Sequence, residues 1–80
     1  MTEYDKDVLD FLLQQVQWCK YQDKILADIE ETLYLMRALA EYRSAHVLPE
    51  QEVQRLNDEM LFLEGEVKRL QLDLDHELTN

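Results

Sequence analysis

The second half of the chain carries one regular apolar repeat. From residue 53 onward, apolar residues recur at alternating steps of three and four, at Val53, Leu56, Met60, Leu63, Val67, Leu70 and Leu74. This heptad spacing puts them on one face of an α-helix and is typical of a coiled-coil seam. Pro49 suits the start of a helix, where its missing N–H costs nothing. The pattern therefore predicts a helix over about residues 49–78 that packs against one neighbour.

The first half carries two apolar stripes side by side. One stripe consists of Val8, Leu12, Cys19, Leu26, Ile29, Leu33, Met36 and Ala40. The other consists of Tyr4, Phe11, Trp18, Tyr21, Ile25, Leu35, Leu39 and Tyr42, and Leu9 and Val16 widen the arc. No Pro or Gly occurs before residue 49, so we predict a helix over about residues 3–44. An apolar arc this wide predicts contact with more than one neighbouring helix.

The segment between the two patterns predicts a short turn at about residues 45–48. The chain is then a single all-α domain, a two-helix antiparallel coiled-coil hairpin. The second helix reaches back only to about residue 15 of the first, so the apolar residues before that point stay uncovered. Such surface usually marks an interface, and we expect the hairpins to dimerise into a four-helix bundle. The alternative is a three-helix bundle with a break near residues 20–24, a polar tract without Pro or Gly.

This scheme divides the apolar residues of the first helix into two sets. The intramolecular seam is expected to pair the repeat of the second helix with Leu26, Ile29, Leu33 and Met36. The dimer or partner interface is expected to contain Val8, Leu9, Phe11, Leu12, Gln15, Trp18, Tyr21, Ile25, Leu35, Leu39 and Tyr42. The aromatic stripe forms either the dimer core, which we favour, or a docking face for another protein. Gln15 and Gln22 either pair across a dimer axis and fix its register, or lie at a partly exposed end.

Composition and charge restrict the class of protein further. The 80 residues are 46% apolar and 32% charged, as in an ordered helical protein, and a single Cys excludes an intramolecular disulfide. The net charge of −10 repels nucleic-acid phosphates and anionic membranes, so neither is an expected partner. No apolar run approaches the length of about 18 residues that spans a bilayer. The N-terminus lacks the basic region of a signal peptide and the lone thiol suits a reducing compartment, so we expect a cytoplasmic protein.

The residues that carry chemistry in other proteins form no expected site here. Asp73 and His76 have the spacing found in carboxylate-bridged di-metal bundles, but neither lies on the seam. Cys19 is expected to be a buried, inert thiol on its stripe, and His46 lies in the turn. With no Ser or Cys placed as a partner for either His, we expect no catalytic residue, metal, cofactor or small-molecule substrate.

The expected function is therefore protein binding without catalysis. The chain fits a small dimeric regulator or adaptor whose partner the sequence does not identify. The alternative is an acidic inhibitor or nucleic-acid mimic that occupies a basic groove. Acidic residues are spread over both predicted helices and interrupted by Lys and Arg, which disfavours the mimic.

Overall fold

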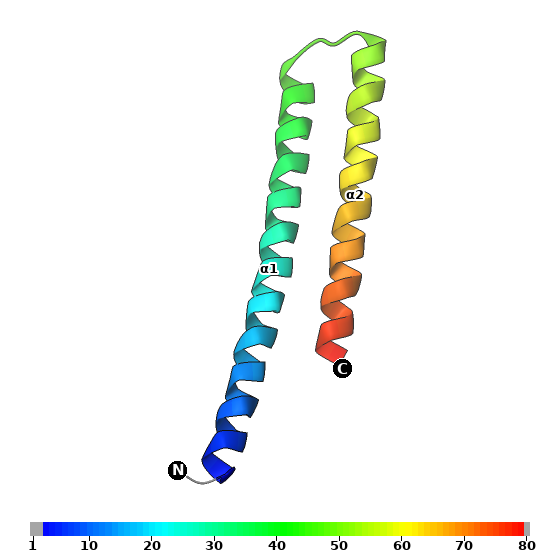
Figure 1. Cartoon of the computed structure of the whole chain (residues 1–80). Helices are drawn as coiled ribbons and strands as arrows, with labels where there is room; N and C mark the ends of the chain where they lie inside the picture. Colours follow the sequence, from blue (N-terminus) through cyan, green and yellow to red (C-terminus); the bar gives the residue numbers. More distant parts are fainter. Residues whose placement is uncertain (1–2, 80) are drawn as a thin grey trace.

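The chain folds into two helices joined by a short turn. A computed structural model describes residues 3–79, and the side chains of residues 5–77. Helix α1 spans Glu3–Ala45 and helix α2 spans Glu50–Thr79, and they run antiparallel (Figure 1). The described residues contain no strand, so the prediction of an all-α, two-helix hairpin is confirmed. Helix α1 passes through residues 20–24 without a break, so the alternative of three helices is wrong.

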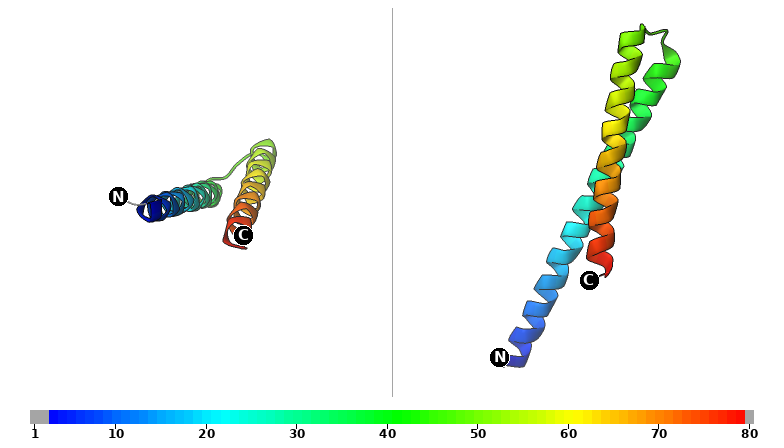
Figure 2. Two further views of the ribbon diagram at one scale, coloured as in Figure 1. Left: turned by 60° about the horizontal axis from the view of Figure 1, so that its bottom comes forward. Right: turned by 90° about the vertical axis from the view of Figure 1, so that its right-hand side faces the viewer.

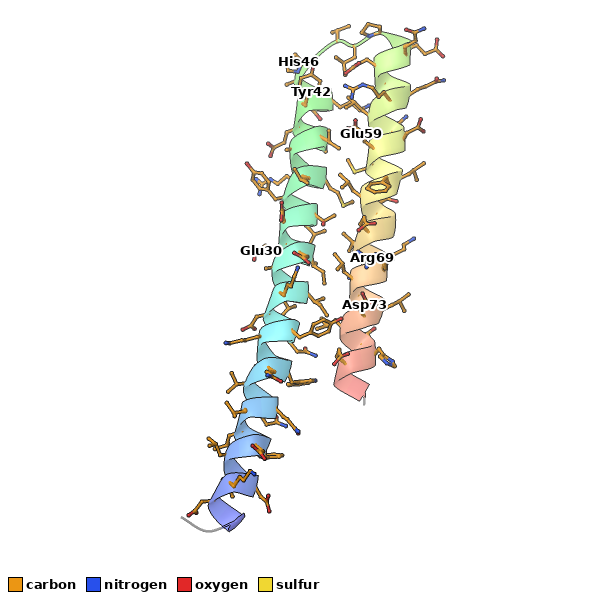
Figure 3. All side chains as sticks on the ribbon, viewed as in Figure 1. Glu30, Tyr42, His46, Glu59, Arg69 and Asp73 are labelled. Atoms are coloured by element: carbon orange, nitrogen blue, oxygen red, sulfur yellow. The ribbon has the colours of Figure 1, made fainter. Side chains whose placement is uncertain are left out.

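Local interactions define the turn at residues 46–49. The carbonyl of Pro49 accepts a hydrogen bond from the Val53 N–H at 3.0 Å, which begins α2. At the other end, Nδ1–H of His46 donates to the Tyr42 carbonyl at 2.8 Å, because a carbonyl oxygen can only accept. The two rings also stack, with 4.3 Å between their centroids (Figure 3). His46 thus satisfies one of the carbonyls that every helix leaves without a partner at its C-terminus.

The core between the helices is thin. Its buried apolar side chains are Ile25 at 4%, Leu56 at 5% and Leu70 at 7% exposed, and no described side chain is completely buried. The other α2 repeat residues are half-buried against α1: Val53, Met60, Leu63, Val67 and Leu74. Near the turn, a guanidinium N–H of Arg43 donates to Oδ1 of Asn57 at 2.7 Å and links the two helices. A two-helix seam has no third element to cover its edges, so few side chains become fully buried.

The molecule is a rod rather than a globule. It measures 70 × 20 × 13 Å. Its radius of gyration is 20.1 Å, against about 12 Å for a compact chain of this length. Helix α1 has 43 residues and α2 has 30, so α1 extends past α2 by about 20 Å at 1.5 Å per residue. Figures 1 and 2 show this N-terminal segment of α1 projecting beyond the C-terminal end of α2. Within the described residues, neither helix holds an apolar stretch that could cross a lipid bilayer.

Candidate interaction surface

The face of α1 that α2 covers follows its own heptad line. The covered residues recur at steps of three and four, and all are buried or half-buried: Gln22, Ile25, Ile29, Thr32, Met36 and Leu39. Thr32 can occupy this seam because its hydroxyl donates to the Asp28 carbonyl at 2.8 Å. Gln22 is only 8% exposed, and its Nε2 has no hydrogen-bond partner. The α1 side of the seam therefore contains two polar residues that apolar periodicity does not reveal.

The observed seam agrees with the expected set on α2 and differs from it on α1. Ile29 and Met36 lie in it, as does the whole α2 repeat. Ile25 and Leu39, expected at an external interface, also face α2, whereas Leu26 and Leu33 are each 49% exposed. Val16, which α2 does not reach, is exposed to the same 49%, so α2 gives those two leucines no cover. Successive residues of a helix point about 100° apart, which separates Ile25 from Leu26.

A second, larger set of apolar residues lies where α1 has no neighbour. Every side chain from residue 5 to residue 21 is exposed. We define the N-terminal apolar surface as the large apolar residues of this segment, which are 39–58% exposed: Val8, Leu9, Phe11, Leu12, Leu13, Val16, Trp18 and Tyr21. All but Leu13 and Val16 belong to the interface expected from the sequence, and Gln15 lies exposed among them. An isolated helix of this length is marginal in water, so the segment gains stability from any surface that covers it.

The total exposed area is large for the mass of the chain. The structure exposes 6771 Å², whereas a compact protein of 9.6 kDa exposes about 5,100 Å². The difference, about 1,700 Å², is roughly twice the 800 Å² that each partner contributes to a standard interface. The rod therefore has ample surface for a stable interface.

A groove between the helices lies close to the turn. It has a volume of about 700 Å³. Its lining is mostly apolar and consists of Leu35, Ala38, Leu39, Tyr42, Arg55, Asp58, Glu59, Phe62 and Leu63. Leu35 and Tyr42, both expected at an interface, are each 44% exposed here, and Phe62 is 67% exposed. The groove is therefore a second apolar region, separate from the N-terminal apolar surface.

Two arginines pair with the regular acidic edge of α2 and offset half of its charge. Glu52, Glu59, Glu66 and Asp73 recur at every seventh position. Arg55 bonds to Glu52 and, at 2.9 Å, to Glu59. Arg69 lies 2.9 Å from Glu66 and 3.5 Å from Asp73 (Figure 3). The hydrogen bond from Arg55 lowers the pKa of Glu52, and the same bond raises the pKa of Arg55.

The remaining candidates for chemistry do not converge. Among the described residues, no group of three or more Cys, His, Asp or Glu side chains could hold a metal ion. Asp73, one member of the candidate Asp-x-x-His pair, is engaged by Arg69. Cys19 is exposed rather than buried as expected, because it lies on the same face of α1 as Leu26 and Leu33, which α2 leaves exposed along its length. These residues lie apart from one another in the sequence, at positions 19, 46 and 73–76 of the rod.

Comparisons with protein-family models, with curated protein sequences and with solved structures gave no match.

Proposed function

We propose that the protein is a non-enzymatic interaction module that acts as a homodimer of helical hairpins. In this proposal it serves as a regulator or adaptor in the cytoplasm, where its lone thiol stays reduced. The observation that carries the proposal is the N-terminal apolar surface, eight large apolar side chains on a helical segment that nothing covers. A four-helix bundle is one arrangement of such a dimer.

The energetic argument rests on the area available. Apolar surface removed from water contributes about 25 cal/mol per Å², and within the described hairpin every side chain of residues 5–21 remains exposed. A second copy is the simplest source of cover, since two-fold dimers are the commonest oligomers of soluble proteins. An exposed apolar surface is unfavourable in water, and association removes it from water. Contiguous apolar patches therefore favour binding or aggregation.

The acidic-mimic alternative has less support. A mimic of nucleic acid presents unpaired carboxylates on one face, whereas Glu52, Glu59, Glu66 and Asp73 each bond to Arg55 or Arg69. A salt series on any complex with a partner protein separates the two functions. A mimic weakens steeply with added salt, and a complex formed by apolar contacts changes little.

Sedimentation equilibrium tests the proposed function directly. We expect the wild-type chain to be a dimer at a concentration on the order of tens of micromolar. The double variant Phe11→Ser and Leu12→Ser is expected to be monomeric while keeping much of its helix content. The matched control replaces Leu61 and Phe62, the same residue types, which are 64% and 67% exposed on α2. The control is expected to remain dimeric.

Two results contradict the proposal. A monomeric wild-type chain at that concentration rules out the homodimer. Dissociation of the Leu61→Ser and Phe62→Ser control, with the Phe11→Ser and Leu12→Ser variant still dimeric, moves the interface to the groove near the turn.

A further inference from the structure

We propose that a second copy of this chain packs against one row of the N-terminal apolar surface in an antiparallel, end-to-end arrangement. The N-terminal segments of the two α1 helices lie side by side around a two-fold axis at the level of residue 14, on the opposite side of the helix from that residue, and the two hairpin bodies point in opposite directions. This inference rests on the proposed homodimer and adds its geometry.

The contact is a second apolar row on α1, distinct from the seam that α2 covers. We define the second apolar row as Leu9, Leu12, Val16 and Cys19, all of them exposed. The row is bounded by Asp5 on one side and Asp23 on the other, each one step further along the same line. Helix α2 covers a different line of α1, the seam that begins at Gln22 and runs toward the turn. A partner on the second apolar row therefore does not collide with α2.

The spacing of the second apolar row is the same in either direction along the chain. Its steps are three, four and three, which read the same in both directions. In an antiparallel pair every member therefore meets an apolar residue: Leu9 meets Cys19 of the second copy, and Leu12 meets Val16 of the second copy. On the two edges of the row, Leu13 meets its own copy and Gln15 meets its own copy across the axis. Two side-chain amides facing each other can satisfy each other's hydrogen bonds, and this fixes one register.

A dimer in which the two hairpins overlap along their whole length is less favourable than the end-to-end arrangement. The reason lies in the residues that continue the line of the second apolar row. Above Asp23 the line continues through Leu26, Glu30, Leu33 and Arg37, so alternate positions are charged. Glu30 lies on the outer side of α1, away from α2 (Figure 3), and Arg37 pairs with Glu41 at 2.9 Å. Covering these side chains with a second hairpin takes the Glu30 carboxylate and the Arg37–Glu41 ion pair out of water, and burying charges is costly.

The distribution of charge selects the antiparallel direction. The chain carries a net charge of −10, yet residues 5–21 contain three acidic and two basic side chains and are nearly neutral. The charge therefore lies mainly on the hairpin body, where acidic residues of α2 outnumber basic ones by nine to three. Antiparallel pairing puts the two bodies at opposite ends of the dimer. Parallel pairing puts them side by side, where like charges repel.

Single-cysteine cross-linking of the full-length chain tests this geometry. Three proteins are compared: the native chain with Cys19, and two Cys19→Ser variants that carry either Leu13→Cys or Leu26→Cys. With the axis at the level of residue 14, the two copies of one residue are offset from each other along the helix axis. This offset is about 3 Å at position 13, 15 Å at position 19 and 36 Å at position 26. A short thiol cross-linker with the reach of one interhelical distance, about 8–10 Å, is expected to join only the Leu13→Cys chains.

Every outcome decides for or against the arrangement. Cross-linking at position 13 alone supports it, and a Gln15→Cys variant in the Cys19→Ser background, with unchanged helix content, is expected to cross-link as well. Efficient cross-linking at positions 13, 19 and 26 indicates parallel pairing, and cross-linking at position 26 alone indicates a fully overlapped bundle; both overturn the arrangement. No cross-linking in a chain that sediments as a dimer overturns the arrangement and leaves the homodimer intact. A chain that is monomeric throughout refutes both proposals.

Discussion

Replacing Leu56 tests whether burial in the seam holds the hairpin together. Leu56 is 5% exposed, and Leu61, five residues later on the same helix, is 64% exposed. Both substitutions, Leu56→Ala and Leu61→Ala, delete the same three carbon atoms from the same type of helix position. The pair therefore isolates burial from composition and from helix propensity.

The expected magnitudes follow from these exposures. Three buried carbons contribute about 0.8 kcal/mol each, so Leu56→Ala is expected to reduce the free energy of unfolding by about 2.3 kcal/mol. A cavity adds little, because the seam between two helices is open along its edges and can close. The same arithmetic gives at most about 0.9 kcal/mol for Leu61→Ala, and the higher helix propensity of Ala offsets a few tenths of that.

Urea unfolding followed by circular dichroism at 222 nm measures both losses. The protein concentration must be the same for all samples, since association shifts apparent stability by mass action. We expect the midpoint to fall clearly for Leu56→Ala and only slightly for Leu61→Ala. Equal losses refute the reasoning, because they mean that the outer face of α2 is covered as thoroughly as the seam.

Three further changes have definite expected outcomes. Gln22→Leu is expected to raise the free energy of unfolding by about 1 kcal/mol or more, because the buried Nε2 of Gln22 has no partner; a lower urea midpoint contradicts this. Gly65→Ala is expected to stabilise by up to about 1 kcal/mol through helix propensity, because a Cβ at position 65 meets nothing within 4 Å; an unchanged thermal midpoint argues against it. Arg55→Gln is expected to raise the pKa of Glu52 in an NMR titration, because the Arg55 hydrogen bond lowers it in the wild-type chain. A group with a lowered folded-state pKa stabilises the fold above its ordinary pKa, and this contribution is lost as pH falls through the folded-state value; an identical Glu52 titration curve in the variant contradicts the assignment.

The sequence was sufficient for the elements and for the mismatch between them. The repeat from Val53 to Leu74 predicts one covered face on α2, and the structure has all seven residues buried or half-buried. The absence of Pro and Gly before residue 49 predicts a long first helix, and α1 is continuous over Glu3–Ala45. Helix lengths follow from local properties, and so does the excess length of α1.

The sequence also predicts most of the N-terminal apolar surface, although it does not predict every residue of the seam that α2 covers. Six of the eight residues of the N-terminal apolar surface belong to the expected interface, because a helix with a shorter partner must leave one end uncovered. The sequence pattern did not indicate Thr32 as a seam residue, and it placed Gln22 at a dimer axis or an exposed end, whereas both continue the spacing of Ile25 and Ile29 in the seam. The line is regular only when one polar residue is allowed in each repeat.

Only the tertiary structure decides which of two adjacent apolar residues faces α2. Ile25 and Leu26 are both periodic in sequence, yet one is 4% exposed and the other 49% exposed. The rotation of α1 around its own axis depends on how its side chains fit between those of α2, and that fit is a property of the pair. Periodicity along one helix determines that a covered face exists, and packing against the second helix determines where around the cylinder that face lies.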